Sequence, residues 1–336
     1  MLIKIPPSWH IPESKATPEG VYLRRREILR AMGLGGALLA GASLGFPGPA
    51  LAGFFGEEPA TPEEYKKSLK GLPPLPAFAK NPLYQDAGRP LTAEHLSGSF
   101  NNFYEFTTSK TEVREKAKNF KTRPWTVEVA GLANKPRTYG IEDLLRAFPL
   151  EERVCRFRCV EAWAMTVPWV GFPLAKLLQA ADPKSEAKFV RFVTLEDPNQ
   201  FPSQKWRVWQ DWPYREGLRL DEAMNELAFV AVGAYGHSLP GQHGAPLRMV
   251  LPWKYGFKGA KSIVKIELVA SRPRTFWNDA GPDEYFFYSN VNPGVPHKRW
   301  SQAEERLLGE DGKRPTLLFN GYGEQVAGLY PGKIPA

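Results

Sequence analysis

The chain has 336 residues, which is enough for one large domain or two small ones with a substantial core. Hydrophobic residues make up 43% and charged residues 24%, a globular balance that excludes an intrinsically disordered chain or a membrane-embedded protein. The formal net charge is +8, but the basic residues are scattered and no nucleic-acid-binding motif accompanies them, so nucleic-acid binding is not expected.

Residues 1–52 have the pattern of an export signal. Three arginines stand at 24–26, an apolar run rich in Gly and Ala follows from residue 31, and Ala-Leu-Ala at 50–52 has the form of a cleavage site. The Arg-Arg-x-Ile-Leu order at 25–29 is similar to a twin-arginine signal. An ordinary secretory leader and a membrane anchor are the alternatives. We expect export to the periplasm by the twin-arginine translocase. Because this route carries proteins that are already folded, the signal favours a protein that receives a complex cofactor before export.

The mature chain is predicted to have an extended arm followed by one domain. Residues 53–98 are rich in proline and charge, which indicates an extended arm on the surface rather than a packed element. Residues 99–336 mix strands and short helices without a regular βαβ alternation, which favours the α+β class. Strands are expected at 125–129, 154–160, 189–195, 246–251 and 262–270, and helices at 141–148, 174–181, 218–226 and 302–308. An apolar run follows the third helix at 227–232.

Cys155 and Cys159 are the only cysteines of the chain and lie in one predicted strand. Alternation along this strand places Cys155, Phe157 and Cys159 on one face and Arg156 and Arg158 on the other. Four residues of strand separate the two cysteine Cα atoms by roughly 13 Å, whereas a disulfide requires about 7 Å or less. The two thiols are therefore expected to be unpaired.

A free thiol in an exported protein suggests a chemical role. Neighbouring arginines and the turn at 161–163 favour the thiolate form of Cys159, and a thiolate is a soft ligand that a high-valent metal retains. A buried inert thiol is the alternative for Cys159 and the preferred interpretation of Cys155. A zinc site built with His237 and His243 is disfavoured, because an extended strand holds the two sulfur atoms far apart.

Glycines and cations alternate over residues 241–248 and 253–262. Glycine lets the backbone approach a ligand, and Arg with Lys supplies donors for a phosphate. The strip has neither a Walker A loop nor a GxGxxG fingerprint. Taken alone, it is equally typical of a solvated basic loop.

Together these segments resemble the catalytic subunits of bacterial protein-methionine-sulfoxide reductases. The resemblance is carried by residues 101–106, 148–153, 158–163, 167–174, 253–258, 282–285 and 292–293. It implies a sulfite-oxidase-type α+β fold, with mixed sheets and short helices, that makes residues 99–336 a molybdopterin-binding domain. It also implies one molybdenum–molybdopterin cofactor per chain.

The same resemblance implies roles for individual residues. Cys159 would be the molybdenum ligand. The implied cofactor contacts are Asn101, Tyr104, Glu105, Thr194, His243, Arg248, Gly259, Ala260 and Lys261. His243 departs from family members that have Asn at this position, and Cys155 stands where an aromatic residue can occur.

Glu161 and Asn102 are the further catalytic candidates. An acidic group two residues after the ligand would repel a sulfite dianion and can relay a proton. An ion pair with Arg158 is the alternative role of Glu161. Asn102 is expected at the mouth of the pocket.

The resemblance implies oxygen-atom transfer that reduces methionine sulfoxide in oxidised periplasmic proteins, with electrons from a membrane haem-binding subunit linked to the quinone pool. Two alternatives stay open on the sequence. One is a sulfite-oxidase-like oxidoreductase, and the other is a non-catalytic periplasmic metal-binding protein.

Overall fold

The computed structural model describes residues 59–207, 210–332 and 334–335. The export signal predicted for residues 1–52 lies outside the described residues. Within them, no helix combines the length and the apolar character needed to cross a bilayer.

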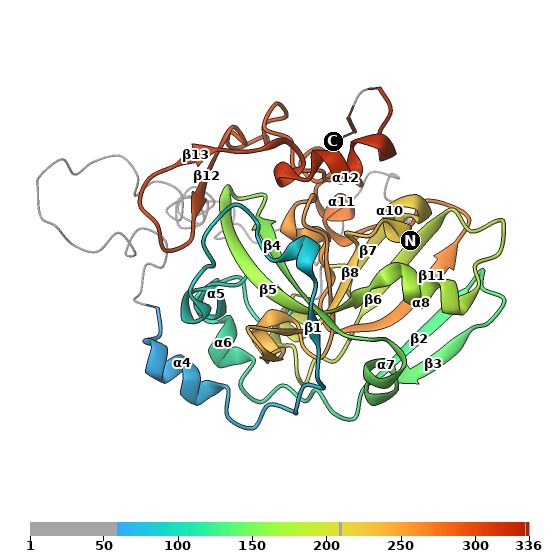
Figure 1. The fold of residues 1–336 in the computed structure, drawn as a ribbon, viewed down its shortest axis with the longest axis horizontal. Coiled ribbons are helices and arrows are strands. Elements are labelled where there is room, and N and C mark those ends of the chain that lie inside the picture. The colour runs from blue at the N-terminus through green and yellow to red at the C-terminus, as the bar shows by residue number, and fades with distance from the viewer. Residues whose placement is uncertain (1–58, 208–209, 333, 336) are drawn as a thin grey trace, which may run out of the picture. The chain divides into compact units, whose positions relative to one another are not determined.

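A large mixed sheet forms one half of the framework (Figure 1). Its longest strand, β5 (Trp163–Pro173), pairs antiparallel with β4 (Glu151–Arg158) and with β8 (Phe229–Ala234). Five short strands complete the eight: β1 (Ala79–Lys80) beside β4, β9 (His237–Ser238) and β10 (Arg248–Val250) beside β8, β12 (Glu304–Leu307) beside β5, and β13 (Arg314–Pro315) beside β12. The pairs β1–β4 and β12–β5 are parallel, so this sheet is mixed.

A second mixed sheet has five strands in the order β3, β2, β11, β6, β7. Their bounds are Arg137–Gly140, Thr126–Gly131, Ile263–Val269, Phe189–Thr194 and Arg215–Arg219, in that order. Only β2 and β11 run parallel. The side chains of β6 alternate between buried and half-buried positions, as expected for a strand with one face on the core.

The helices are short and connect the strands. The α-helices are α4 (Pro62–Ser68), α5 (Glu94–Ser99), α6 (Val113–Lys116), α7 (Ile141–Ala147), α8 (Leu174–Ala181), α9 (Pro202–Trp206), α10 (Leu220–Met224), α11 (Phe276–Ala280) and α12 (Gly323–Val326). The 3-10 turns are η2 (Pro82–Tyr84), η3 (Gly241–His243), η4 (Gly256–Lys258), η5 (Leu318–Gly321) and η6 (Ala327–Leu329).

The large sheet buries both of its faces. On one face, Val170 and Phe172 of β5 belong to the core cluster that contains the apolar side chains of the second sheet and of α8. On the other face, Trp163 and Met165 of β5 pack in a separate cluster with Cys155 and Cys159. Each large apolar side chain buried in this way stabilises the fold by roughly 1.5–3 kcal/mol. The cysteines therefore lie on the face of the sheet that is turned away from the main core.

The predicted α+β class, with mixed sheets and short helices, is confirmed. The helix predicted at 174–181 matches α8, whose buried residues at 174, 177, 178 and 181 form the apolar stripe of an amphipathic helix. The strands predicted from residues 125, 154, 189, 246 and 262 are present within a few residues as β2, β4, β6, β10 and β11, and the apolar run at 227–232 overlaps β8.

Two local predictions were wrong, and one helix is shorter than predicted. The helix predicted at 302–308 is strand β12, because pairing with β5 outweighs the local pattern. The helix predicted at 218–226 is present as α10, although residues 218 and 219 belong to strand β7. The predicted arm contains helices, since α4 and α5 lie beside each other, in blue and teal in Figure 1. A capping box between Thr61 and Glu64 starts α4, and this pattern is visible in the sequence.

Candidate functional site

Cys159 lies at the turn between β4 and β5, at the wall of a cavity. Its main-chain N–H donates to the carbonyl of Trp163 at 2.8 Å, and its carbonyl accepts from Ala162, which has a positive φ of 65°. This tight turn places the side chain beside about 720 Å³ of space that no protein atom fills. The sulfur therefore faces a space that can hold a large ligand, although Cys159 is only 4% exposed.

Asn102 and Glu161 flank the sulfur. The Asn102 side-chain amide donates to Cys159 Sγ at 3.3 Å and to Glu161 Oε2 at 2.9 Å. The Glu161 main-chain N–H also points at the sulfur, at 3.4 Å. The other carboxylate oxygen of Glu161 lies 3.1 Å from Lys110 Nζ. The predicted trio is thus brought together, and Lys110 is a fourth member that the sequence analysis did not identify.

The predicted low pKa of the Cys159 thiol is wrong for the protein alone. Burial, and to a smaller extent the Glu161 carboxylate, raise the pKa of this thiol to about 12. A thiolate at this position therefore requires a cation beside the sulfur, which a bound metal would supply. The face assignment is nevertheless confirmed, since Cys155 and Cys159 lie in one cluster and both are free thiols.

Arg158 points away from the site and does not pair with Glu161. Its guanidinium forms an ion pair with Glu305 at 3.0 Å and donates to Gln302 at 2.9 Å, in a region where both charged side chains are fully buried. The alternative role considered for Glu161, an ion pair with Arg158, is therefore wrong. Alternation along β4 separates the two, because residue 158 lies on the opposite face from the cysteines.

Two cations face the same cavity. Arg248 lines it, and its guanidinium donates to the main-chain carbonyls of His243 and Met249, at 3.2 and 3.3 Å. Lys261 lines the same cavity. Burial lowers the pKa of Arg248 to about 10 and lowers that of Lys261, whereas it raises the pKa of the nearby Glu105 carboxyl. Two cations facing one weakly acidic carboxyl leave an electropositive cavity that suits a phosphate.

The structure places eight of the twelve predicted site residues around this cavity and four outside its wall. The eight are Asn101, Asn102, Tyr104, Glu105, Cys159, Glu161, Arg248 and Lys261. The other four are Thr194, which donates to Glu105 at 3.5 Å, His243, whose Nε2 lies 3.3 Å from the Ser97 carbonyl, Gly259, which lines a smaller neighbouring cavity, and Ala260, which is fully buried. The loop that carries Gly259 and Ala260 is in contact with Arg248, since a Cβ on Gly259 would lie 3.0 Å from the guanidinium.

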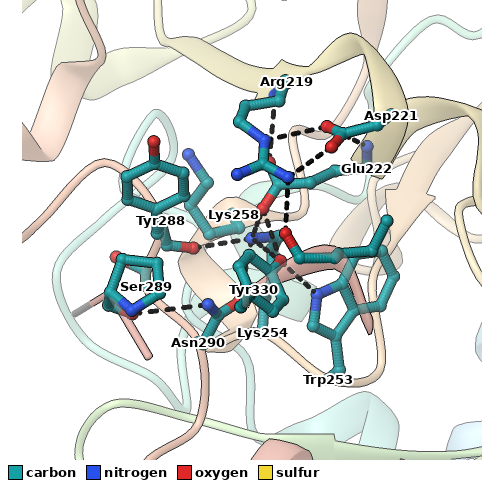
Figure 2. Close-up of polar contacts among 12 residues, drawn as sticks. Arg219, Asp221, Glu222, Trp253, Lys254, Lys258, Tyr288, Ser289, Asn290 and Tyr330 are labelled. Carbon is teal, nitrogen blue, oxygen red and sulfur yellow. Dashed lines mark hydrogen bonds and ion pairs between the residues drawn. The ribbon is translucent and has the colours of Figure 1, made fainter. Parts of the chain in front are cut away.

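Only one of the three lysines in the glycine-rich strip reaches the cavity. Lys254 donates to Glu222 at 2.7 Å and to Asn290 at 3.0 Å inside the core, as Figure 2 shows. Lys258 forms an equally buried ion pair with Glu216 at 2.5 Å. Both lysines anchor the strip to neighbouring elements, and Lys261 is the lysine available to a ligand.

The sequence analysis missed the aromatic mouth of the cavity. Tyr104, Trp277 and Tyr285 line it, and the Trp277 ring centroid lies 4.9 Å from those of both tyrosines. Phe257 extends this wall, 5.4 Å from Tyr285. The chain has 10 Trp, 12 Tyr and 20 Phe, but their spacing in the sequence does not indicate which of them meet.

The polar groups of the site suit an organic cofactor. The side-chain oxygens of Asn101 and Asn102 and Nδ1 of His243 are buried without a hydrogen-bond partner among the described residues. A buried polar atom without a partner costs about 1–3 kcal/mol. A pterin has ring donors and acceptors that would hydrogen-bond to these groups. Its phosphate would pair with the two cations. The donor set therefore fits a molybdenum–molybdopterin group held by one thiolate.

The described residues offer no set of ligands for the zinc site considered as an alternative. In the part of the chain that the structure describes, no three His, Cys, Asp or Glu side chains gather closely enough to bind a metal ion. His237 lies 2.5 Å from Glu94, and burial lowers the pKa of His243 to about 3. Neither histidine therefore joins the cysteines in a zinc site.

Comparison with known proteins identifies the family. Residues 114–277 match the oxidoreductase molybdopterin binding domain. A solved structure of the sulfane dehydrogenase SoxCD from Paracoccus pantotrophus is 17% identical, with a TM-score of 0.43, and the match covers 71% of this chain and 59% of that chain. The protein-methionine-sulfoxide reductase catalytic subunit MsrP of Burkholderia mallei (strain ATCC 23344) is 48% identical over 326 residues, which are 96% of this chain and 93% of the relative. The chain therefore belongs to the family of protein-methionine-sulfoxide reductase catalytic subunits.

Proposed function

We propose that this chain reduces methionine sulfoxide residues of oxidised periplasmic proteins. The observation that carries the proposal is a single sulfur, Cys159, that faces a large cavity, with Glu161 and Asn102 beside it and two cations in the cavity wall. One sulfoxide, two electrons and two protons yield one thioether and one water. The site must therefore hold a two-electron centre, admit a methionine side chain and deliver protons.

The chain's part in holding the cofactor follows from the donor set. Cys159 would bind molybdenum, and Arg248 and Lys261 would bind the phosphate of the pterin. Asn101, Tyr104, Glu105, Thr194, His243, Gly259 and Ala260 would complete the cofactor pocket, directly or through a neighbouring residue. When bound, the group supplies two-electron oxygen-atom transfer.

Replacing Lys261 by methionine is expected to weaken retention of the cofactor about tenfold or more, because a charge-assisted hydrogen bond contributes about 1.5–3 kcal/mol. The measurement is pterin fluorescence after denaturation, together with the ratio of molybdenum to protein. Lys265→Met is the matched control, since Lys265 pairs with Glu128 on the surface at 3.3 Å. Full cofactor content in Lys261→Met would contradict the assignment.

We assign proton delivery to Glu161. Asn102 holds one carboxylate oxygen and Lys110 the other, so the carboxyl is fixed 3.7 Å from Cys159 Sγ. A carboxyl fixed beside the sulfur can give a proton to the departing sulfoxide oxygen. Asn102 and Lys110 then act as positioning residues for Glu161.

Glu161→Gln is expected to lower kcat by about 10²–10⁴, because an amide cannot supply the proton. Molybdenum content should stay at the wild-type value, which separates a loss of proton delivery from a loss of the cofactor. Glu161→Asp keeps a carboxyl and should recover part of the rate. A Glu161→Gln variant with wild-type kcat would remove this residue from the mechanism.

The aromatic mouth suits the thioether product and its sulfoxide. Sulfur packs favourably against aromatic rings, and the rings of Tyr104, Trp277 and Tyr285 are available at the entrance. Burial and the Glu161 carboxylate raise the pKa of Tyr104, so its hydroxyl remains a hydrogen-bond donor at neutral pH. An entrance open to solvent also admits a side chain that is attached to a protein.

We propose residues 1–52 as a twin-arginine signal that exports the folded protein to the periplasm, residues 53–98 as an N-terminal arm and residues 99–336 as the catalytic domain. The proposed electron donor is a membrane haem-binding subunit that draws on the quinone pool. The name of the Burkholderia relative, a catalytic subunit, supports a second subunit.

Substrate turnover tests the proposal against its nearest rival. The holoenzyme with an artificial electron donor is expected to reduce methionine sulfoxide and not to oxidise sulfite. Repulsion between the Glu161 carboxylate and the sulfite dianion supports this preference for methionine sulfoxide over sulfite. Turnover of sulfite alone would overturn the proposal, and purified protein without molybdenum would favour a non-catalytic role.

A further inference from the structure

A second cavity of about 370 Å³ lies next to the cofactor cavity. The two share part of their walls, since Val160 and Phe257 line both. None of the sequence predictions concerned this cavity, and the proposed reaction does not use it. Its position beside the entrance makes it accessible to whatever extends from the methionine side chain.

One short segment runs between the two cavities. Tyr285 lines the cofactor cavity, whereas its neighbours Glu284 and Phe286 line the second cavity. The residues 284–286, which leave the turn closed by the Gly281 carbonyl, therefore contribute to the walls of both cavities. The two cavities adjoin closely enough for one bound peptide to reach both.

The walls of the second cavity favour an apolar occupant. Phe257, Phe286, Val295 and Pro296 contribute hydrocarbon, and Phe286 is 40% exposed at its edge. Large apolar side chains open to solvent next to a cavity are typical of a binding site.

Most polar side chains of this cavity are already paired inside the protein. Gln302 donates to the Val160 carbonyl at 2.7 Å. The Glu284 carboxylate pairs with Arg299 at 2.9 Å and lies 3.5 Å from Nε2 of His297, which is buried without a hydrogen bond among the described residues. The wall thus offers a polar ligand few unpaired groups, of which His297 is one.

We propose that the second cavity is a subsite for an apolar side chain of the same polypeptide that presents the methionine sulfoxide. This flanking subsite, formed by Val160, Phe257, Phe286, Val295 and Pro296, rests on the proposed function. In an extended peptide, successive residues rise about 3.3 Å and point to opposite sides. A residue one or two positions from the methionine sulfoxide can therefore enter the subsite while the sulfoxide enters the cofactor cavity. The preferred substrate is then an unfolded or exposed segment with an apolar residue near the oxidised methionine.

The test uses the holoenzyme, an artificial electron donor and five-residue peptides. Each peptide has methionine sulfoxide at the centre and Gly or Ser elsewhere, with one leucine placed in turn at each of the four other positions. We expect one position at which leucine raises kcat/KM about tenfold over the peptide without leucine, the effect of burying one apolar side chain. Aspartate at that position should give no increase.

A variant in which a larger side chain fills the flanking subsite provides the second measurement. Val295→Trp adds bulk at a half-buried position that the proposed mechanism does not use. The leucine advantage should vanish in this variant, while kcat/KM for free methionine sulfoxide and for the Gly/Ser peptide stays unchanged. Leu83→Trp is the matched control, because Leu83 is 79% exposed and lines neither cavity, so the advantage should persist there.

The outcomes separate the two proposals. If the holoenzyme reduces free methionine sulfoxide but no leucine position raises kcat/KM, the flanking subsite alone is overturned. Persistence of the leucine advantage in Val295→Trp overturns it as well. If neither free methionine sulfoxide nor any of the peptides is reduced, the proposed function fails and the subsite fails with it.

Discussion

Replacing Cys159 by serine is expected to abolish reductase activity and to deplete the protein of molybdenum. Serine keeps the size of the side chain but offers a hydroxyl, which is a harder ligand than a thiolate and far less acidic than a thiol. The Asn102 amide and the Glu161 main-chain N–H that now contact the sulfur would then contact an uncharged oxygen. Molybdenum per protein chain and turnover of methionine sulfoxide are the two measurements.

Cys155→Ala is the control for this experiment. Cys155 lies on β4, the strand that leads to Cys159, and belongs to the same core cluster. It is 2% exposed, lines neither of the two cavities and has a pKa raised to about 12 by burial. We expect the alanine variant to lose some stability and to keep both its molybdenum and its activity. Full activity and molybdenum in Cys159→Ser would refute the assignment of the ligand, as would their loss in Cys155→Ala alone.

Lys254→Met is expected to destabilise the folded protein by about 3–5 kcal/mol and to lower Tm by roughly 10 °C. Lys254 lies at the centre of the buried network in Figure 2, where its ammonium donates to Glu222, to Asn290 and to the Tyr288 carbonyl. Methionine has a similar length but no charge, so the variant leaves the Glu222 carboxylate buried without its cation. Breaking one half of a buried ion pair carries a cost of this size. Thermal unfolding followed by circular dichroism measures it.

Two further variants test whether the unpaired Glu222 charge causes the loss of stability. Adding Glu222→Gln to Lys254→Met removes the unpaired charge and should recover a large part of the lost stability. Arg146→Met breaks the exposed pair with Asp143 and should change stability by less than about 0.5 kcal/mol. A Lys254→Met protein that melts within about 2 °C of the wild type would show that the network contributes little to the fold.

Elements with a strong local pattern could be predicted from the sequence, and elements that depend on distant partners could not. The stripe of α8 and the alternation of β2 are local, so these predictions hold. Strand β5 was not predicted at all, although it is the longest, because all but the last of its residues are buried and it lacks polar alternation. Strand β12 owes its conformation to β5, which lies about 140 residues away along the chain.

Some features of the site could be predicted from the sequence, and others could not. The resemblance led to Cys159, Asn102 and Glu161, which the structure brings together, and to the cations Arg248 and Lys261. The arginines next to Cys159 in the sequence do not offset the burial that raises the pKa of its thiol, because they lie on the opposite face of β4. Arg158 turns to Glu305, more than a hundred residues away, and the charge that meets Glu161 comes from Lys110.

Residue types and their order determined the class of fold and the family, and they single out Cys159 as the proposed sulfur ligand. These depend on chemistry that a few side chains carry wherever the chain folds. Only the tertiary structure decided which lysine faces the cavity and which two are sealed in the core, where the aromatic mouth forms, and that a second cavity adjoins the first. The physical reason is that charge pairing, burial and cavity shape arise from contacts between segments distant in sequence. No local pattern contains the energies of those contacts.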